Sequence, residues 1–354
     1  MIENIFDIEP YSLKKVQKEK LLIDELNRLT SLHVRSCEGY KNILSSHNLL
    51  QKHHTNLSDF FPLPVRLFKE YDLKSSDNII KTLTSSGTTS QKVSKIYLDK
   101  ETAQLQSRAL VKIMQSFLGK ARLPMLIVES KNIIKNRNEF SARGAGSVGL
   151  STLGKKHTYI LNDDMSLDVD TLLDFLHRYK DEKILIFGFT FMLWQYFFKE
   201  LQRRDIQIDL SNAIMFHSGG WKKLQSEAIS NKAFKEAFKE LTSLKEIHNF
   251  YGMVEQVGSI FVECEQGHLH TPNFADIIIR DLKTMEPLGF NKRGFIELLS
   301  LIPKSYPGHV LLSEDIGEIL GEDSCKCGRM GKYFKVHGRV AKAEIRGCSD
   351  THGI

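Results

Sequence analysis

The order of hydrophobic and polar residues divides the 354-residue chain into three regions. In residues 1–60, leucines recur at helical spacing on one face, which predicts a helical opening; they are Leu21, Leu22, Leu26, Leu29 and Leu32. From about residue 61, short apolar runs alternate with amphipathic stretches. That alternation predicts strands and helices in a parallel α/β core. Short strands near turn signals over about residues 270–338 predict a smaller β-rich part.

The predicted elements of the core follow from the lengths of these runs. Strands are expected over residues 125–128, 184–189, 213–216 and 277–279. Helices are expected over residues 100–118, 169–179 and 233–244. Pro62 and Pro64 interrupt the helical opening, since proline fixes its own backbone and biases the preceding residue away from the helix.

Composition narrows the class of protein. A hydrophobic content of 41% suffices for a sizeable core. The 49 basic and 43 acidic residues are interspersed, so nucleic-acid binding is not indicated. The most apolar run, residues 184–198, is too short to span a bilayer, and the N-terminus has no secretory pattern, so we expect a cytoplasmic protein. Five cysteines in such a chain favour thiol chemistry or metal ligation over disulfides.

The densest polar stretch is Thr-Ser-Ser-Gly-Thr-Thr-Ser-Gln-Lys, from Thr84 to Lys92. A glycine lets successive N–H groups converge on an anion, and the hydroxyls and Lys92 add further donors. Phosphate is therefore the expected ligand. The spacing is neither a Walker loop nor a dinucleotide-binding fingerprint. Taken alone, the segment fits a polar surface turn better than a phosphate site.

Two later motifs carry groups suited to a nucleotide. Residues 249–256 read Asn-Phe-Tyr-Gly-Met-Val-Glu-Gln, in which a ring can cover a planar base and Glu255 can hold a metal bound to phosphate. In Ser-Glu-Asp-Ile-Gly, Asp315 stands at a turn where a carboxylate can accept both ribose hydroxyls. The sequence His-Gly-Arg-Val follows at residues 337–340.

These motifs, in this order, resemble the adenylate-forming superfamily of acyl-CoA synthetases, adenylation domains and luciferases. The chain looks most like the acyl-protein synthetases of the LuxE type, which are related to phenylacetate-CoA ligases. The closer match includes His-Ser-Gly-Gly-Trp-Lys-Lys at residues 217–223 and the ending at residues 338–350. It runs from about residue 60 to the C-terminus.

The resemblance implies a fold and its divisions. It implies the α/β fold of the N-terminal domain of adenylate-forming enzymes, a parallel core with a smaller β-rich subdomain. Residues 1–60 would be a helical segment packed on the core, 61–338 the catalytic domain, and 339–354 a hinge and tail. The mobile C-terminal domain of the wider superfamily would be missing, as in the acyl-protein synthetases.

The resemblance also implies roles for individual residues. Ser86, Gly87, Thr88, Thr89 and Lys92 would form the phosphate loop. Gly219, Gly220, Tyr251 and Gly252 would line the adenine and acyl-adenylate pocket, with the Tyr251 ring near adenine. Glu255 would bind Mg²⁺, Asp315 would hold the ribose, and Arg339 would sit at the hinge and reach the ribose.

Three positions depart from the superfamily pattern. Ser90 replaces a glycine of the loop, Val254 replaces a threonine that usually touches the α-phosphate, and Lys342 stands where a hinge acid is common. Phosphate handling must therefore rely on other donors.

The cysteines suggest a separate metal site. Cys325 and Cys327 form a close pair at a turn, typical of a metal knuckle. Cys264 and His270 are a second pair, and three thiolates with one imidazole would complete a tetrahedral zinc site. His268 could take the place of His270. The alternative is a set of unconnected reduced thiols.

The expected function combines these features. A carboxylic acid, a fatty acid by the resemblance, reacts with Mg·ATP to give acyl-AMP and pyrophosphate, and a thiol then takes the acyl group. The resemblance makes Cys348 the acceptor, for delivery to an acyl reductase or acyltransferase. One alternative is a coenzyme A ligase of the phenylacetate type. Another is a non-catalytic nucleotide-binding scaffold.

Overall fold

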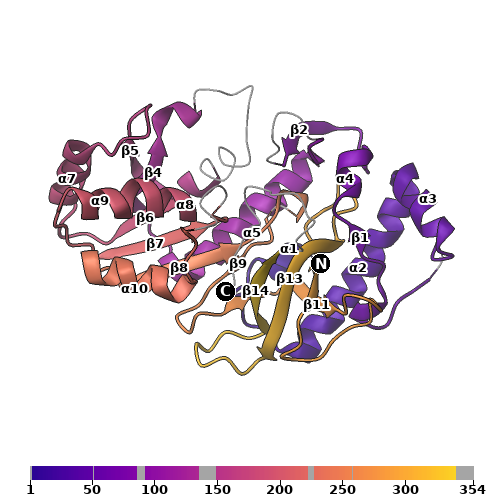
Figure 1. Ribbon diagram of the computed structural model, residues 1–354. Coiled ribbons are helices and arrows are strands. Elements are labelled where there is room, and N and C mark those ends of the chain that lie inside the picture. The colour runs from indigo at the N-terminus through magenta and orange to yellow at the C-terminus, as the bar shows by residue number, and fades with distance from the viewer. Residues whose placement is uncertain are drawn as a thin grey trace. The chain divides into compact units, whose positions relative to one another are not determined.

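The computed structural model describes residues 2–50, 52–85, 92–134, 149–221, 227–256 and 258–339. These form two compact units (Figure 1). Within the described residues, the first unit combines the chain up to Phe117 with the chain from Gly252 to Arg339. The second unit contains Leu118–Tyr251. The N-terminal helices and the β-rich part therefore belong to one unit, although they lie at opposite ends of the sequence.

The helical opening predicted from leucine spacing is confirmed. It consists of α1 (Ile2–Ile5), α2 (Lys15–Ser36) and α3 (Glu38–Ser46). Leu22, Leu26 and Leu29 of α2 are fully buried, as expected for one apolar face. The short elements η1 (Leu57–Asp59), β1 (Leu63–Pro64) and α4 (Leu67–Glu70) then lead into the sheets of the unit.

The β-rich part of the first unit is a mainly antiparallel sheet. Its strands follow the order β10-β14-β13-β12-β11, and β1 pairs in parallel with β13. The bounds are β10 (Leu269–His270), β11 (Ala275–Arg280), β12 (Gly294–Ser300), β13 (Val310–Glu322) and β14 (Lys332–Arg339). Burial alternates along most of β13, so one face of this strand packs inward.

A separate hairpin and a long helix complete the first unit. Strands β2 (Ile79–Thr84) and β3 (Lys95–Asp99) pair antiparallel, with Thr84 opposite Lys95. Helix α5 (Lys100–Leu118) follows directly and confirms the helix predicted there. The 3-10 helix η5 (Val254–Gln256) and the short strand β9 (Phe261–Val262) precede β10.

The second unit contains the predicted parallel core. Its strands follow the order β5-β4-β6-β7-β8, and every neighbouring pair is parallel. The bounds are β4 (Leu123–Ser130), β5 (Gly154–Leu161), β6 (Ile184–Phe189), β7 (Ala213–Ser218) and β8 (Glu246–Tyr251). All residues of β6 and β7 are buried, which explains why these strands are continuous apolar runs.

The helices described in the second unit are η2 (Lys131–Ile134), α7 (Val169–Arg178), α8 (Thr190–Met192), the π-helix η3 (Leu193–Phe198), α9 (Lys199–Arg203) and α10 (Asn231–Thr242). Two of them, α7 and α10, begin at a residue whose side chain caps the first turn. Asp168 accepts a hydrogen bond from the Thr171 amide, and Ser230 accepts one from the Ala233 amide. These caps fix the starts of α7 and α10.

Two buried histidines join α2 to the residues beside β13. The rings of His33 and His309 lie 4.8 Å apart between centroids. His33 Nδ1 pairs with Ser75 Oγ at 2.7 Å, and His309 Nε2 pairs with Thr30 Oγ1 at 3.0 Å. Burial lowers the pKa of His33 to about 3 and that of His309 well below its usual value, so both rings are neutral near pH 7.

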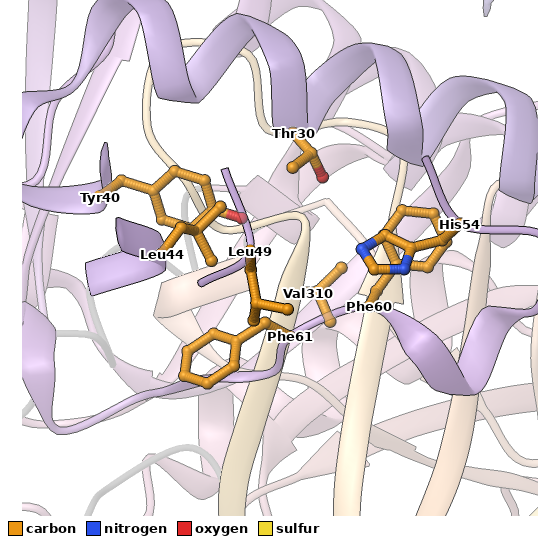
Figure 2. Close-up of a pocket in the computed structure, with 8 residues that line it drawn as sticks. All are labelled: Thr30, Tyr40, Leu44, Leu49, His54, Phe60, Phe61 and Val310. Atoms are coloured by element: carbon orange, nitrogen blue, oxygen red, sulfur yellow. The ribbon is translucent and has the colours of Figure 1, made fainter. Parts of the chain in front are cut away.

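A pocket lies beside this cluster (Figure 2). It is lined by Thr30, Tyr40, Leu44, Leu49, His54, Phe60, Phe61 and Val310. Tyr40 lines the pocket and also contacts the histidine pair, since its hydroxyl lies 3.5 Å from His309 Nε2. Most of the lining residues are apolar, and they come from α2, α3, residues 49–61 and β13. The pocket therefore belongs to the packing of the N-terminal helices.

The two buried histidines predict acid sensitivity of the fold. The folded-state pKa of His33 lies below the unfolded value of 6.5, so its stabilising effect is complete above pH 6.5 and is lost as the pH falls toward 3. Between pH 7.5 and 5.5 this one group should lower the free energy of unfolding by about 1.4 kcal/mol. Urea unfolding at both pH values should show a pH dependence smaller by that amount in His33→Gln. The exposed His177→Gln is the control, and equal pH dependence in all three proteins would contradict the assignment.

Candidate active site and metal cluster

The predicted magnesium ligand Glu255 lies next to the base of the predicted phosphate loop. Its side chain is 1% exposed, and the Ser94 hydroxyl donates a hydrogen bond of 2.6 Å to Glu255 Oε1. Ser94 is completely buried and is separated from Glu255 by 161 positions in the sequence. The hairpin that carries the loop is thus attached to the acid on η5.

Ser85, which directly follows the first hairpin strand, forms hydrogen bonds with Ser94, which directly precedes the second. The Ser94 amide donates to Ser85 Oγ at 2.9 Å, and the Ser85 amide donates to the Ser94 carbonyl at 3.1 Å. Ser85 and Ser94 flank residues 86–93 and are paired with each other, and Ser94 contacts Glu255. The loop residues Ser86, Gly87, Thr88 and Thr89 themselves lie outside the described residues.

Sequence reasoning missed Ser94. A serine two positions after the conspicuous Lys92 looked like part of an ordinary strand start. Its one signal was a hydroxyl at the end of a hydroxyl-rich motif. Lys92 itself is exposed, and its ammonium pairs with Glu70 Oε2 at 2.7 Å, which raises the pKa of Lys92.

The 3-10 helix that carries Glu255 is held by buried amide contacts. Gln256 Nε2 donates to the carbonyl oxygens of Gly308 at 3.1 Å and Leu298 at 3.3 Å. The Ser259 and Ser300 hydroxyls are 2.6 Å apart. These contacts fix η5 against β12. The Glu255 carboxylate is therefore held by Ser94 at its side chain and by the contacts of η5 at its backbone.

The structure brings together the two residues assigned to the ribose. Asp315 of β13 and Arg339 of β14 face each other in the antiparallel register. Arg339 Nε donates to Asp315 Oδ1 at 3.1 Å, and Asp315 is fully buried. The guanidinium pairs with the carboxylate and fixes its direction.

In the second unit, the predicted pocket residues stand at the carboxyl ends of neighbouring parallel strands. Gly219 and Gly220 follow β7, and Tyr251 ends β8 with its side chain fully buried. Gly219 has a φ of 83°, a conformation that favours glycine. Gly252 is the first residue of the second segment of the first unit. In open α/β sheets, the carboxyl ends of strands are the usual place for ligands.

A small pocket with polar groups lies at the same end of these strands. It is lined by Thr190, His217, Trp221, Ile229, Asn231, Phe234 and Asn249. Thr190 Oγ1 and His217 Nδ1 are 2.9 Å apart, and both side chains are buried. Thr190 had not been singled out, because a single hydroxyl after an apolar run carries no signal in the sequence.

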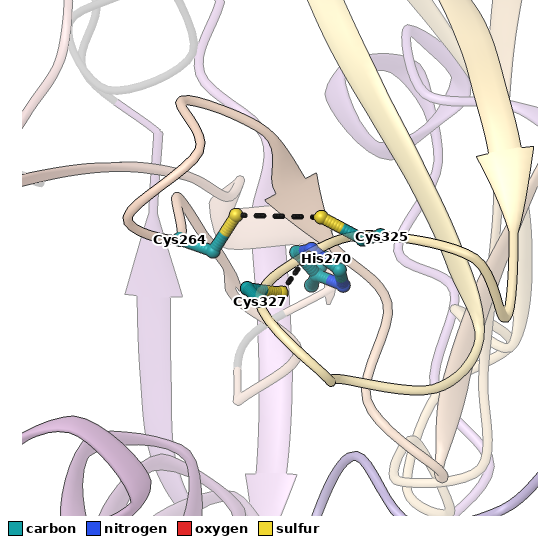
Figure 3. A group of neighbouring side chains, drawn as sticks. All are labelled: Cys264, His270, Cys325 and Cys327. Atoms are coloured by element: carbon teal, nitrogen blue, oxygen red, sulfur yellow. Dashed lines mark hydrogen bonds between the residues drawn. The ribbon is translucent and has the colours of Figure 1, made fainter.

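The four predicted zinc ligands form one cluster in the first unit (Figure 3). The ligand atoms of Cys264, His270, Cys325 and Cys327 all lie within 4.8 Å of one another. Cys264 Sγ is 3.9 Å from Cys325 Sγ, and Cys327 Sγ is 3.3 Å from His270 Nε2. Two pairs far apart in sequence therefore meet, as expected.

His268 lies beside the cluster but is not one of its four members. Its Nδ1 is 3.5 Å from Cys325 Sγ, and its ring stacks on Tyr333 with 5.1 Å between centroids. Burial lowers the pKa of His270 to about 3 and raises the pKa of Cys264 to about 12. The neutral imidazole is the form in which histidine binds a metal.

Comparison with solved structures defines the class of fold. The chain is similar to 2-hydroxyisobutyryl-CoA ligase in the thioesterification state with 2-HIB-AMP and CoA, at 14% identity and a TM-score of 0.71 over 94% of this chain and 70% of that one. The same ligase in its postadenylation state with R3-HIB-AMP is 13% identical, with a TM-score of 0.70 over 94% of this chain and 69% of that one. An ATP-bound RpMatB-BxBclM chimera is 15% identical, with a TM-score of 0.50 over 74% of this chain and 48% of that one. The fold is that of the adenylate-forming ligases.

The particular family follows from the sequence as a whole. The chain belongs to the acyl-protein synthetase family of the LuxE type, whose pattern matches residues 1–353. This confirms the resemblance inferred from the motifs, and it makes the chain a member of a family of ATP-dependent acid–thiol ligases. A search of curated proteins finds no match. Within the described part of the chain, no helix has the length and apolar character required to cross a membrane.

The bond between Ser94 and Glu255 predicts a measurable loss of stability in Ser94→Ala. Removing the hydroxyl deprives a buried carboxylate of a donor, which should lower the free energy of unfolding by about 1–3 kcal/mol. Urea unfolding at pH 7 measures the change. Ser107→Ala is the matched control, because its exposed hydroxyl bonds only to a carbonyl in its own helix, and it should change stability by less than about 0.5 kcal/mol. Similar values for both variants would show that the bond is unimportant.

Proposed function

We propose that the chain activates a carboxylic acid with ATP, forming acyl-AMP, and then transfers the acyl group to a thiol. One observation carries the proposal: the base of the Ser/Thr-rich loop is fastened through Ser94 to the buried Glu255. That arrangement holds a buried carboxylate against Ser94, the residue that precedes β3 and follows the predicted phosphate loop in the sequence. Family membership and the shared fold support the same chemistry.

In the first step, a carboxylate oxygen attacks the α-phosphorus of ATP. The bond from that phosphorus to the oxygen bridging to the β-phosphate breaks, and pyrophosphate leaves. Ser86, Gly87, Thr88, Thr89 and Lys92 are assigned to the β- and γ-phosphates. Lys92 would exchange its surface partner Glu70 for phosphate.

Glu255 fits the role of a magnesium ligand. Mg²⁺ is commonly held by one or two carboxylates together with substrate phosphates and water. A single buried carboxylate, oriented by Ser94 and η5, meets that requirement. When bound, the ion neutralises charge on the transferring phosphates.

The remaining residues are assigned to the nucleoside. Asp315 would accept the ribose hydroxyls while Arg339 keeps its carboxylate in place. Gly219, Gly220 and Gly252 have no side chains to obstruct a flat base, and Tyr251 would lie near adenine. These assignments rest on the resemblance together with the carboxyl-end positions of β7 and β8.

In the second step, a thiolate attacks the carbonyl carbon of acyl-AMP. The bond from that carbon to the phosphate oxygen breaks, AMP leaves, and a thioester forms. We assign the thiol to Cys348, which lies outside the described residues, and the acid to a fatty acid. The acyl group would pass to an acyl reductase or acyltransferase. Because the chemistry consumes ATP, we place the protein in the cytoplasm.

The proposal requires ATP and Mg²⁺ as cofactors, whereas zinc in the cysteine and histidine cluster would serve the fold. Two alternatives remain as outcomes of experiment. A coenzyme A ligase of the phenylacetate type would form acyl-CoA and leave the protein unlabelled. A nucleotide-binding scaffold would release no pyrophosphate with any acid.

Replacing Glu255 with Gln should reduce acid-dependent pyrophosphate release at least 100-fold, because an anionic metal ligand is lost (about 2.7 kcal/mol in the barrier). A coupled pyrophosphate assay with Mg·ATP and a series of fatty acids measures this. Glu246→Gln, an exposed acid that pairs with Lys183, is the control and should stay within about twofold of the unmodified protein. If Glu255→Gln also stays within about threefold, Glu255 is not the metal ligand.

Replacing Cys348 with Ser should leave acyl-AMP formation intact and remove covalent labelling. The protein is incubated with Mg·ATP and radiolabelled fatty acid, denatured, and treated with hydroxylamine, which cleaves thioesters. The unmodified protein and the neighbouring variant Ser349→Ala should carry hydroxylamine-sensitive label. Label that persists in Cys348→Ser would place the acceptor elsewhere, and acyl-CoA formation on adding coenzyme A would favour the ligase alternative.

A further inference from the structure

The cysteine and histidine cluster is built from two turns of the same design. Each turn has the sequence Cys-x-x-Gly, and in each the glycine amide donates to the cysteine carbonyl. The bond is 2.9 Å in the turn from Cys264 to Gly267 and 3.0 Å in the turn from Cys325 to Gly328. Both glycines have positive φ values, 78° and 82°. Two matching turns that present thiols to one point are an arrangement suited to metal binding.

The distances within the cluster fit a tetrahedral zinc ion. Zinc bonds of about 2.3 Å to sulfur place tetrahedral ligand atoms about 3.8 Å apart. The separation between Cys264 Sγ and Cys325 Sγ is 3.9 Å, and that between Cys327 Sγ and His270 Nε2 is 3.3 Å. A disulfide needs about 2.05 Å between sulfurs, so the cysteines are not bonded to each other. Three thiolates and one imidazole select zinc over the oxygen-seeking Mg²⁺ and Ca²⁺.

The surroundings of the cluster match the charge of such a site. Zinc with three thiolates carries a net charge of about −1. Arg329, two residues after Cys327, lies with its guanidinium 4.1 Å from the ring centre of Phe117 and also pairs with Glu265. The Gln266 amide lies 3.4 Å from Cys264 Sγ, so a backbone donor points at the thiolate. A cation and an amide donor around thiolates stabilise the bound state.

The residues that follow the metal ligands form the docking surface for the N-terminal segment 9–18. The Asn273 amide donates to the Pro10 carbonyl at 2.6 Å, and the Met330 amide donates to the Tyr11 carbonyl at 2.9 Å. Lys18 Nζ donates to Thr271 Oγ1 at 2.7 Å. These three partners lie one to three positions beyond His270 or Cys327.

A second set of contacts connects the same segment to the turn that contains Cys325. One carboxylate oxygen of Asp323 accepts a hydrogen bond of 2.8 Å from the Lys15 amide. The other oxygen accepts one of 2.7 Å from the Gly331 amide. Tyr11 packs edge-on against the His270 ring, with 6.1 Å between centroids. Residues 9–18 thus contact the segment after His270 and both sides of the turn that contains Cys325 and Cys327.

We propose that Cys264, His270, Cys325 and Cys327 bind one Zn²⁺ and that this ion fixes the surface on which residues 9–18 dock. Removal of zinc frees the two turns, and the start of α2 loses its partners. The site is separate from the residues assigned to ATP, and its metal content is measured without any assay of activity. A failure here leaves the proposed ligase chemistry untouched.

Elemental analysis of the purified protein should find about one zinc per chain. Cys325→Ser and His270→Ala should retain less than about a tenth of it, because each removes a ligand of a four-coordinate site. His268→Ala and Cys37→Ser are the controls and should keep the full amount. A different stoichiometric metal, an equal loss in His268→Ala, or folded protein with no metal would overturn the zinc assignment.

Hydrogen exchange tests the docking role on the unmodified protein, so it does not depend on whether a variant folds. After a chelator has removed the metal, the amides of residues 9–18 and of Asn273, Met330 and Gly331 should exchange at least tenfold faster. Amides of β6 and β7 in the second unit are the internal reference and should be unchanged. Adding Zn²⁺ back should restore protection. Protection of residues 9–18 that survives metal removal would refute the coupling.

Discussion

A buried carboxylate between two lysines holds the first unit together. Asp276 of β11 lies 3.0 Å from Lys332 Nζ and 3.7 Å from Lys18 Nζ, and all three side chains are largely buried. Charges removed from water are tolerated only when they are paired, and removing one partner typically costs 3–5 kcal/mol. The two lysines lower the pKa of Asp276, while burial lowers the pKa of Lys18 to about 8. The helical opening is therefore bound to the sheet by electrostatics as well as by apolar packing.

The same sheet carries both of the features that matter for function. Strand β14 supplies Lys332 to the ion cluster and Arg339 to Asp315. The turn before β14 supplies two of the cysteines. A single antiparallel pair, β13 with β14, thus connects the cysteine and histidine cluster at one end with the proposed ribose contact at the other. Rigid strands of this kind keep functional groups in register more precisely than loops do.

Much of this structure could be predicted from sequence because the relevant signals are local. Strands β6 and β7 are buried on both faces, so they appear as apolar runs, and α5 appears through its helical spacing. Cys325 and Cys327 are conspicuous as a close pair at a turn, and Cys264 with His270 is a second candidate pair. By contrast, the partnerships of Ser94 with Glu255 and of His33 with His309 join residues far apart in sequence. Serine and histidine carry no pattern that points to a distant partner, so only the fold reveals these pairs.

The docking of the N-terminal segment has a consequence for synthesis on the ribosome. Lys18 leaves the ribosome 253 residues before its partner Thr271, which at about 5–20 residues per second is a delay of roughly 13–50 s. During that interval Lys18 of α2 cannot pair with Thr271 or Asp276. The second unit, whose strands all lie between Leu118 and Tyr251, can form its sheet in the meantime. The nascent chain would thus complete the middle of the molecule first, and the earliest helix would be the last to find its place.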